Sequence, residues 1–210
     1  MTKTARQLMA ISDRRLMDDS AYTLIRQTAQ KLGANFWLVV REKDLDGQEL
    51  YSFSRKIQGL LKDTDAHLLI NHRLDVAISL GSQVGVQLPE SGLPLEAVRR
   101  YAGTERILGR SVHDLAGAQE AAAQGADIVI AAPVFEVPGK GPALGLNGMK
   151  KMHEAIQGRA LLFALGGIEQ HKLDELSPFV DGFAAIRSIW RNDLVHAPVF
   201  LLDQSPPGPT

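Results

Sequence analysis

The sequence predicts an α/β protein that folds as one (β/α)8 TIM barrel, with a single domain over residues 1–203. The first observation behind this prediction is a series of eight short apolar runs along the chain. The second is that amphipathic stretches, typical of helices, separate these runs. The third is the length of 210 residues, which suits eight compact strand–helix units. An open, doubly wound sheet is the alternative, and the lack of a glycine-rich turn after the first run disfavours it.

The apolar runs are predicted to be parallel strands because most of them are continuous and do not alternate with polar residues. A continuous run is typical of a strand that is buried on both faces, as in a parallel sheet. In chain order we expect strands at residues 8–12, 36–40, 67–71, 84–88, 106–111, 127–132, 160–165 and 182–187.

The amphipathic stretches between the strands are predicted to be helices. Asp114 precedes one of them and is a plausible N-cap, since a carboxylate can accept hydrogen bonds from the first turn. Five glycines follow a helical stretch, where glycine commonly serves as the C-cap: Gly33, Gly81, Gly103, Gly125 and Gly158. The predicted helices cover residues 15–32, 47–61, 74–80, 94–102, 114–124, 146–156 and 170–179.

The composition indicates an ordinary globular protein, with 45% hydrophobic and 22% charged residues. A formal net charge of −1 gives no global field towards nucleic acid or an anionic membrane, so we expect neither as a partner. The absence of cysteine excludes disulfides and thiolate chemistry. With no signal-like segment and no apolar run near the roughly 20 residues of a membrane span, we expect a cytoplasmic protein. The tail at residues 204–210 is too polar to pack and is predicted to be disordered.

Polar side chains follow the predicted strands, and in a barrel that edge carries the chemistry. Five cations are expected there: Arg41, Lys43, Arg73, Lys140 and Arg187. Such cations suit phosphate or pyrophosphate, and the pair Gly166-Gly167 lets backbone N–H groups approach a ligand. The alternative is that the cations form rim salt bridges with Glu42, Asp44 and Glu136. We favour a phosphate site, with Lys140 closing over it from a long loop.

Two histidines follow strand ends. His72 is a candidate for a base, a metal ligand or a solvated rim residue. His113 is expected to cap or pack near the helix that follows it. No HExxH pattern and no close set of His, Asp and Glu is present, so we expect no metal site.

With these pieces in place, the sequence resembles the thiamin phosphate synthase and thiazole tautomerase (TenI-like) superfamily over about residues 8–191. The segments that carry the resemblance are "REKD", "INHRLDVAISLGSQVGVQL", "ILGRSVHDLAGAQEAAAQGADIVIAAPVFEVPGKGPALGL", "ALGGI" and "FAAIRSIW". The resemblance implies a barrel that binds thiazole phosphate near the ends of its last two strands. It also implies that the synthase reaction joins an aminopyrimidine pyrophosphate to that phosphate and releases pyrophosphate with the help of Mg²⁺.

The resemblance assigns roles to individual residues. Arg41 and Lys43 correspond to the pyrophosphate-binding pair, and Lys140 corresponds to the loop lysine, a catalytic candidate. The other substrate-binding residues that the resemblance implies are Asn71, Arg73, Ser111, Gly166, Gly167, Ile186 and Ser188, and Arg187 is added as a candidate because it follows the last predicted strand.

The chain also departs from both branches of the superfamily. His72 and Gly92 stand where the synthase has its two Mg²⁺-binding aspartates, and Glu90 is the one nearby substitute. Pro133 stands where the tautomerase has its acid–base histidine, and proline has no titratable group. His72 is therefore our candidate for a proton-transfer residue.

Three functions follow for a ligand that is a small phosphorylated thiazole or pyrimidine. The preferred one is a tautomerase-like isomerase that needs no metal or other cofactor. The alternatives are a divergent thiamin phosphate synthase that uses Mg²⁺, or an inactive phosphate-binding or regulatory protein. The sequence leaves a homo-oligomer open.

Overall fold

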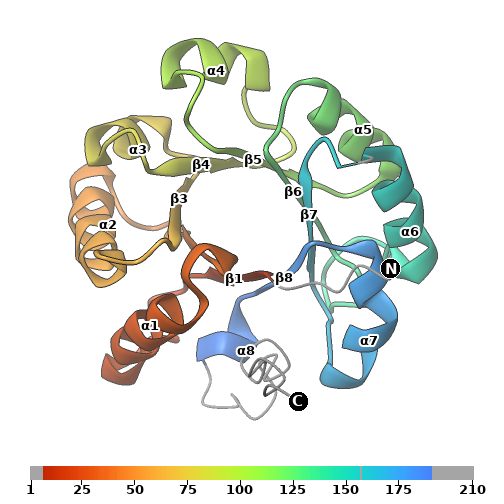
Figure 1. Ribbon diagram of the computed structural model, residues 1–210, viewed down its shortest axis with the longest axis horizontal. Coiled ribbons are helices and arrows are strands. Elements are labelled where there is room, and N and C mark those ends of the chain that lie inside the picture. Colours follow the sequence, from red (N-terminus) through yellow and green to blue (C-terminus); the bar gives the residue numbers. More distant parts are fainter. Residues whose placement is uncertain (1–6, 157, 191–210) are drawn as a thin grey trace, which may run out of the picture.

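The computed structural model describes residues 7–156 and 158–190. In that part of the chain, eight parallel strands close into a barrel in sequence order, with the last strand paired to the first. Figure 1 shows the ring of strands with the helices arranged around its outside. The predicted (β/α)8 barrel is therefore confirmed. The strands are β1 (Gln7–Ile11), β2 (Phe36–Val40), β3 (His67–Asn71), β4 (Gly85–Leu88), β5 (Leu108–Val112), β6 (Ile128–Ala131), β7 (Leu161–Leu165) and β8 (Gly182–Ala185).

The helices lie in the expected connections, with short 3-10 turns beside some of them. They are α1 (Asp19–Leu32), α2 (Gly47–Leu61), α3 (Leu74–Leu80), α4 (Leu95–Ala102), α5 (Leu115–Ala123), α6 (Gly145–Ile156), α7 (Leu173–Leu176) and α8 (Arg187–Trp190). The 3-10 turns are η1 (Gly33–Asn35), η2 (Gln170–Lys172) and η3 (Ser177–Phe179).

Local capping explains where several helices begin. Helix α1 starts at Asp19, later than predicted, because the Asp18 side chain accepts hydrogen bonds from the backbone N–H groups of Ser20 and Ala21. Asp114 caps α5 as predicted, accepting from the Gly117 N–H at 2.7 Å. At the carboxyl end of the barrel, β8 stops at Ala185, so Arg187 starts α8 instead of ending a strand.

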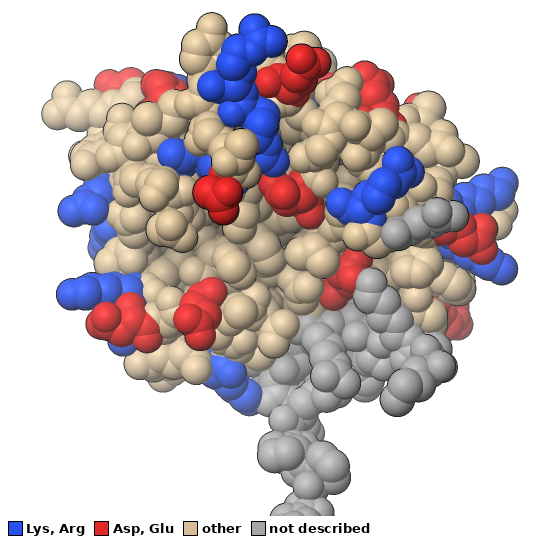
Figure 2. Space-filling model, turned by 45° about the horizontal axis from the view of Figure 1, so that its top comes forward, with Lys and Arg blue, Asp and Glu red and all other residues tan. Residues whose placement is uncertain are grey.

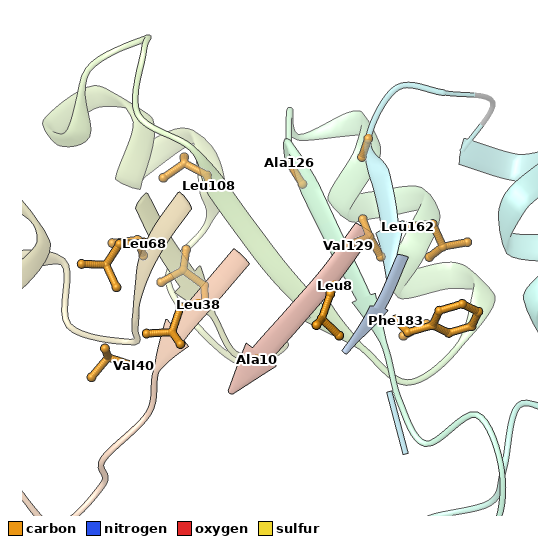
Figure 3. Close-up of a cluster of buried hydrophobic side chains, with 14 of the residues drawn as sticks. Leu8, Ala10, Leu38, Val40, Leu68, Leu108, Ala126, Val129, Leu162 and Phe183 are labelled. Carbon is orange, nitrogen blue, oxygen red and sulfur yellow. The ribbon is translucent and has the colours of Figure 1, made fainter. Parts of the chain in front are cut away.

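The core has two layers that are separated by the barrel wall. The inner cluster comes from strands alone, whereas the outer cluster joins the alternate strand residues to the helices. Figure 3 shows part of the outer cluster, with Leu8, Leu38 and Leu162 contributed by three different strands. Fully burying such a side chain contributes about 1.5–3 kcal/mol. The buried members of the inner cluster are Met9, Ile11, Trp37, Val39, Leu69, Ile128, Ile130, Phe163 and Ala184.

This alternation defines the phase of each strand, by which we mean which of its residues point into the barrel and which point outward. On β2 the inner residues are Trp37 and Val39, and on β3 Leu69 is inner while Leu68 and Ile70 are outer. Because side chains of a strand alternate between its faces, residues two positions further on point to the same side. The phase therefore decides which side chains reach the space above the inner cluster.

The amino-terminal end of the barrel interior is closed by aromatic packing. Trp37 stacks on His67 with a centroid distance of 3.8 Å, and its Nε1 donates to Gln7 Oε1 at 2.6 Å. Burial lowers the pKa of His67, because the charged imidazolium is poorly solvated there.

The expectations about membrane spans and surface charge can be compared with the described residues. No helix in the described ranges has the length and apolar character needed to cross a membrane. On the face that Figure 2 presents, lysines and arginines are interspersed with acidic residues, with no broad patch of one sign. The tail predicted at residues 204–210 lies outside the described residues.

Candidate functional site

A cavity of about 560 Å³ opens at the carboxyl ends of the strands. Its floor is the top of the inner cluster, including Ile11, Val39 and Ile130. Its walls come from the strand ends and from the long β6–α6 loop, which contributes Val137 and Lys140. The cavity therefore occupies the edge at which barrel enzymes carry their chemistry.

Four cationic side chains line this cavity: Arg41 and Lys43 after β2, Lys140 from the β6–α6 loop, and Arg187 after β8. None of them forms a salt bridge within the described part of the chain. Their charges are therefore not neutralised by a salt bridge among the described residues.

The predicted rim salt bridges do not use these cations, because another arginine takes the nearby carboxylates. Arg14 pairs with Asp44, and its backbone N–H donates to Glu42. Glu42 is buried and also accepts a hydrogen bond from Ser12 Oγ at 2.5 Å. Glu42 therefore links the turns after β1 and β2, and neither Arg41 nor Lys43 forms a salt bridge with it.

The glycine pair after β7 lies under the β6–α6 loop. Both Gly166 and Gly167 line the cavity and have positive φ angles, 99° and 66°. A Cβ atom on Gly167 would come within 2.9 Å of the backbone of Phe135 and Glu136. Only glycine fits this turn without displacing the loop, so the pair sets how closely the loop approaches the strand end.

The other predicted ligand-binding residues fall into two groups. Asn71, Ser111, Ile186 and Ser188 line the cavity. Arg73 does not, and its guanidinium is bound to the Asp75 carboxylate at 2.6 and 2.9 Å. The structure therefore assembles most of the predicted site and leaves Arg73 outside it.

His72, the predicted catalytic histidine, is also outside the cavity lining. It is exposed, has a positive φ of 67°, and donates its backbone N–H to Gln87 O at 2.8 Å. The cause is the phase of β3: Leu69 and Asn71 face inward, so the next residue faces away. To reach a ligand in the cavity, His72 would need the turn after β3 to rearrange.

A polar amide that the sequence analysis did not assign to the site lies on the cavity floor. Gln87 on β4 is 2% exposed, lines the cavity, and donates from Nε2 to Ser111 Oγ at 3.1 Å. Its Oε1 has no hydrogen-bond partner among the described residues. Gly109 makes room for it, since a Cβ there would lie 1.9 Å from Oε1. The floor thus holds an amide group that a polar ligand or water can satisfy.

His113 is the second residue whose place differs from expectation. It lines the cavity, and its Nδ1 lies within hydrogen-bond distance of the Ala132 carbonyl. Its backbone N–H donates to Glu90 Oε1 at 3.1 Å, while the cap of α5 is Asp114. The signal for its position was in the sequence: His113 is two residues beyond Ser111 and therefore in phase with it.

The donors for a metal ion are few in this cavity. In the parts of the chain that the structure describes, no three or more His, Cys, Asp or Glu side chains are grouped to hold a metal. Glu90 and Glu169 line the cavity, but Glu90 already accepts the His113 N–H. Glu90 and Glu169 are thus the two carboxylates that the cavity lining offers to a cation.

Comparison with known proteins extends over most of the chain. The family model described as "Thiamine monophosphate synthase" matches residues 8–189. The "Thiamine-phosphate synthase" of Caldanaerobacter subterraneus subsp. tengcongensis is 31% identical over 191 residues, which cover 89% of this chain and 87% of that protein. The "Putative thiamine-phosphate synthase" of Geobacter sulfurreducens is 36% identical over 154 residues, 71% of each chain. The solved "Thiamine phosphate pyrophosphorylase" from Pyrococcus furiosus superposes with a TM-score of 0.75 at 28% identity, covering 89% of this chain and 88% of that one.

Proposed function

The chain belongs to the thiamine monophosphate synthase family, and from that premise we propose that it binds a thiazole phosphate and isomerises it by proton transfer without a metal ion. The observation that carries the proposal is the group of four cations around the cavity, Arg41, Lys43, Lys140 and Arg187, none paired with a carboxylate of the described residues. The proposal places the protein in thiamin biosynthesis, in keeping with the names of its relatives.

The cations suit a phosphate because each retains hydrogen-bond donors for its oxygens. Arg41 and Arg187 can bind two oxygens at once, and Lys43 and Lys140 can act as mobile point charges. A hydrogen bond to a charged group contributes about 1.5–3 kcal/mol. Three or four such contacts at one rim are enough to fix the phosphate and orient the rest of the ligand over the floor.

Proton transfer is preferred to pyrophosphate release because of the residues at two positions. Departure of pyrophosphate needs its developing charge stabilised, which Mg²⁺ held by carboxylates does well. Here the corresponding positions carry His72 and Gly92. An isomerisation needs only a bound phosphate and a group that moves a proton.

The second candidate is a divergent thiamin phosphate synthase. It is favoured by the names of the relatives, including the one 31% identical over 89% of this chain. Mg²⁺ often keeps waters and uses one or two carboxylates together with substrate phosphates, so Glu90 and Glu169 are the residues this candidate would recruit.

Binding is tested first, with a matched pair of arginine variants. Arg41→Ala removes a cavity cation, whereas Arg73→Ala removes a cation that is paired with Asp75 outside the cavity. We expect calorimetry with thiazole phosphate to give at least a tenfold weaker Kd for Arg41→Ala, about 1.4 kcal/mol, and less than about a twofold change for Arg73→Ala. Equal effects of the two variants would contradict the assignment of the site.

Turnover then separates the candidate reactions. We expect isomerisation of a thiazole carboxylate phosphate in the presence of EDTA. Thiamin phosphate formed from thiazole phosphate and aminopyrimidine pyrophosphate only with Mg²⁺ would instead support the synthase. Tight binding without either product would indicate a binding or regulatory protein.

A further inference from the structure

His113 is the one histidine in the described part of the chain that lines the cavity. It stands at the carboxyl end of β5, two residues beyond Ser111, and faces the same space. The other ionisable side chains in the lining are the four cations and the carboxylates of Glu90 and Glu169. Imidazole is the side chain that exchanges a proton most readily near neutral pH.

A hydrogen bond determines which ring nitrogen of His113 is open to a ligand. Nδ1 lies against the carbonyl oxygen of Ala132, and a carbonyl oxygen can only accept. Nδ1 must therefore carry the hydrogen, and in the neutral ring Nε2 is bare. No hydrogen bond occupies Nε2 within the described residues. The ring is thus held in the tautomer that can accept a proton at Nε2.

The contacts of His113 do not have to break when Nε2 takes a proton. When Nε2 takes a proton, the Ala132 carbonyl still accepts from Nδ1–H. The Glu90 carboxylate, which accepts the His113 backbone N–H at 3.1 Å, adds a negative charge beside the residue. Both contacts can therefore remain in place while Nε2 holds a proton during the reaction.

We propose that His113 is the acid–base residue of the isomerisation. In the first step, Nε2 removes a proton from a carbon of the phosphorylated heterocycle, and the C–H electron pair enters the conjugated ring. In the second step, the imidazolium returns that proton at the other end of the conjugated system. The two steps leave His113 neutral and need no oxidant or reductant. The assignment rests on the proposed function, and it replaces His72 as the proton carrier.

Three histidine-to-glutamine variants test the proposal. The glutamine amide of His113→Gln can still donate to the Ala132 carbonyl but cannot carry a proton. We expect its turnover to fall by about 100-fold or more, since general acid–base catalysis commonly contributes about 10²–10⁴-fold. Its Kd for thiazole phosphate should change by less than about threefold. His153→Gln, on α6, controls for the substitution itself, and His72→Gln tests the rival residue.

Chemical rescue tests whether the role of His113 is purely structural. We expect added imidazole to restore part of the turnover of His113→Ala, which leaves space for the missing ring. Turnover lost in His72→Gln and kept in His113→Gln would overturn the proposal.

A measurement without turnover separates this inference from the proposed function. If the wild-type protein isomerises no thiazole, the proposed function fails, and the state of the His113 ring still tests the inference. Nitrogen NMR should show hydrogen on Nδ1 and a bare Nε2 whose resonance moves when thiazole phosphate is added. Hydrogen on Nε2, or no movement of that resonance, would refute the inference.

Discussion

The carboxyl ends of β3 and β5 each carry a histidine, and only one of the two reaches the cavity. His72 comes one residue after the inward-facing Asn71, and His113 comes two residues after the inward-facing Ser111. Both side chains are exposed, but His72 has a left-handed backbone and lies outside the cavity lining, whereas His113 contacts the Ala132 carbonyl and lines the cavity. The difference teaches that position relative to the inner face decides whether a side chain reaches the cavity more than proximity to a strand end does.

The same alternation holds after β2, where three charged residues follow one another. Arg41 and Lys43 line the cavity, while Glu42 between them is buried against Ser12 and the Arg14 backbone. Consecutive side chains after β2 are thus divided between the cavity and the contacts that hold the loops together.

The largest effect on stability is expected from a substitution on β5 at the cavity floor, where Gly109 packs against Gln87. Gly109→Val would place a branched side chain where Gln87 Oε1 now lies, 1.9 Å from a Cβ. Overpacking of this kind commonly costs about 1–3 kcal/mol. We expect chemical denaturation to show that loss and calorimetry to show weaker binding of thiazole phosphate, because Gln87 is pushed into the cavity.

Two further variants locate the cause of that loss. In a double-mutant cycle, Gln87→Ala should recover part of the stability lost in Gly109→Ala, because it removes the clashing amide. Gly59→Ala, in the last turn of α2 with nothing within 4 Å of its Cβ, should instead stabilise the protein, by at most about 0.5–1 kcal/mol. Additive effects at positions 87 and 109 would show that the two residues do not compete for space.

A smaller effect is expected at the β3 end, where His72 has a φ of 67°. A left-handed backbone costs an L-residue about 1–2 kcal/mol, and glycine avoids that cost but loses more entropy on folding. We expect His72→Gly to stabilise the protein by about 0.5–1 kcal/mol, measured by denaturation, without loss of turnover. If His72→Gly raises stability but abolishes turnover, His72 takes part in the reaction, and the contrast between His72 and His113 is wrong.

The fold was predictable because continuous apolar runs mark strands that are buried on both faces. All eight strands were placed within two residues at their starts, and the cations after β2 and β8 were expected at the correct edge. Because these runs are continuous, they do not show which strand residues face the barrel interior. Leu68, Leu69 and Ile70 are equally apolar, so the sequence does not tell which of them faces inward, or that His72 lies outside the cavity lining.

Other parts of the site depend on contacts between distant residues. The pairing of Arg73 with Asp75 is a local contact, but the hydrogen bond from Ser12 to Glu42 requires β1 and β2 to be adjacent. The contact of His113 with Ala132 likewise requires the ends of β5 and β6 to meet. Once the inner residues of each strand are known, counting in twos from them recovers Arg41, Lys43, Ser111 and His113 together.

The smallest effect is expected from a third histidine, which tests the phase rule at the other end of β3. His67 is in phase with Leu69, stacks on Trp37, and has its pKa lowered by burial. The unfolded chain therefore binds a proton more readily than the folded one as the pH falls below about 6.5, and the free energy of unfolding declines in that range. Above that pH the residue is neutral in both states and the decline is absent.

His67→Phe keeps an aromatic ring for Trp37 and removes the titration. We expect the free energy of unfolding of the wild type, measured by urea denaturation from pH 7 to pH 5, to fall more steeply than that of the variant. A loss of packing or of a hydrogen bond would change the free energy of unfolding of the variant by the same amount at every pH. The difference in slope with pH therefore reports only the protonation of His67. Parallel curves would mean that His67 is solvated in solution, and that residues in phase with the inner cluster need not be buried.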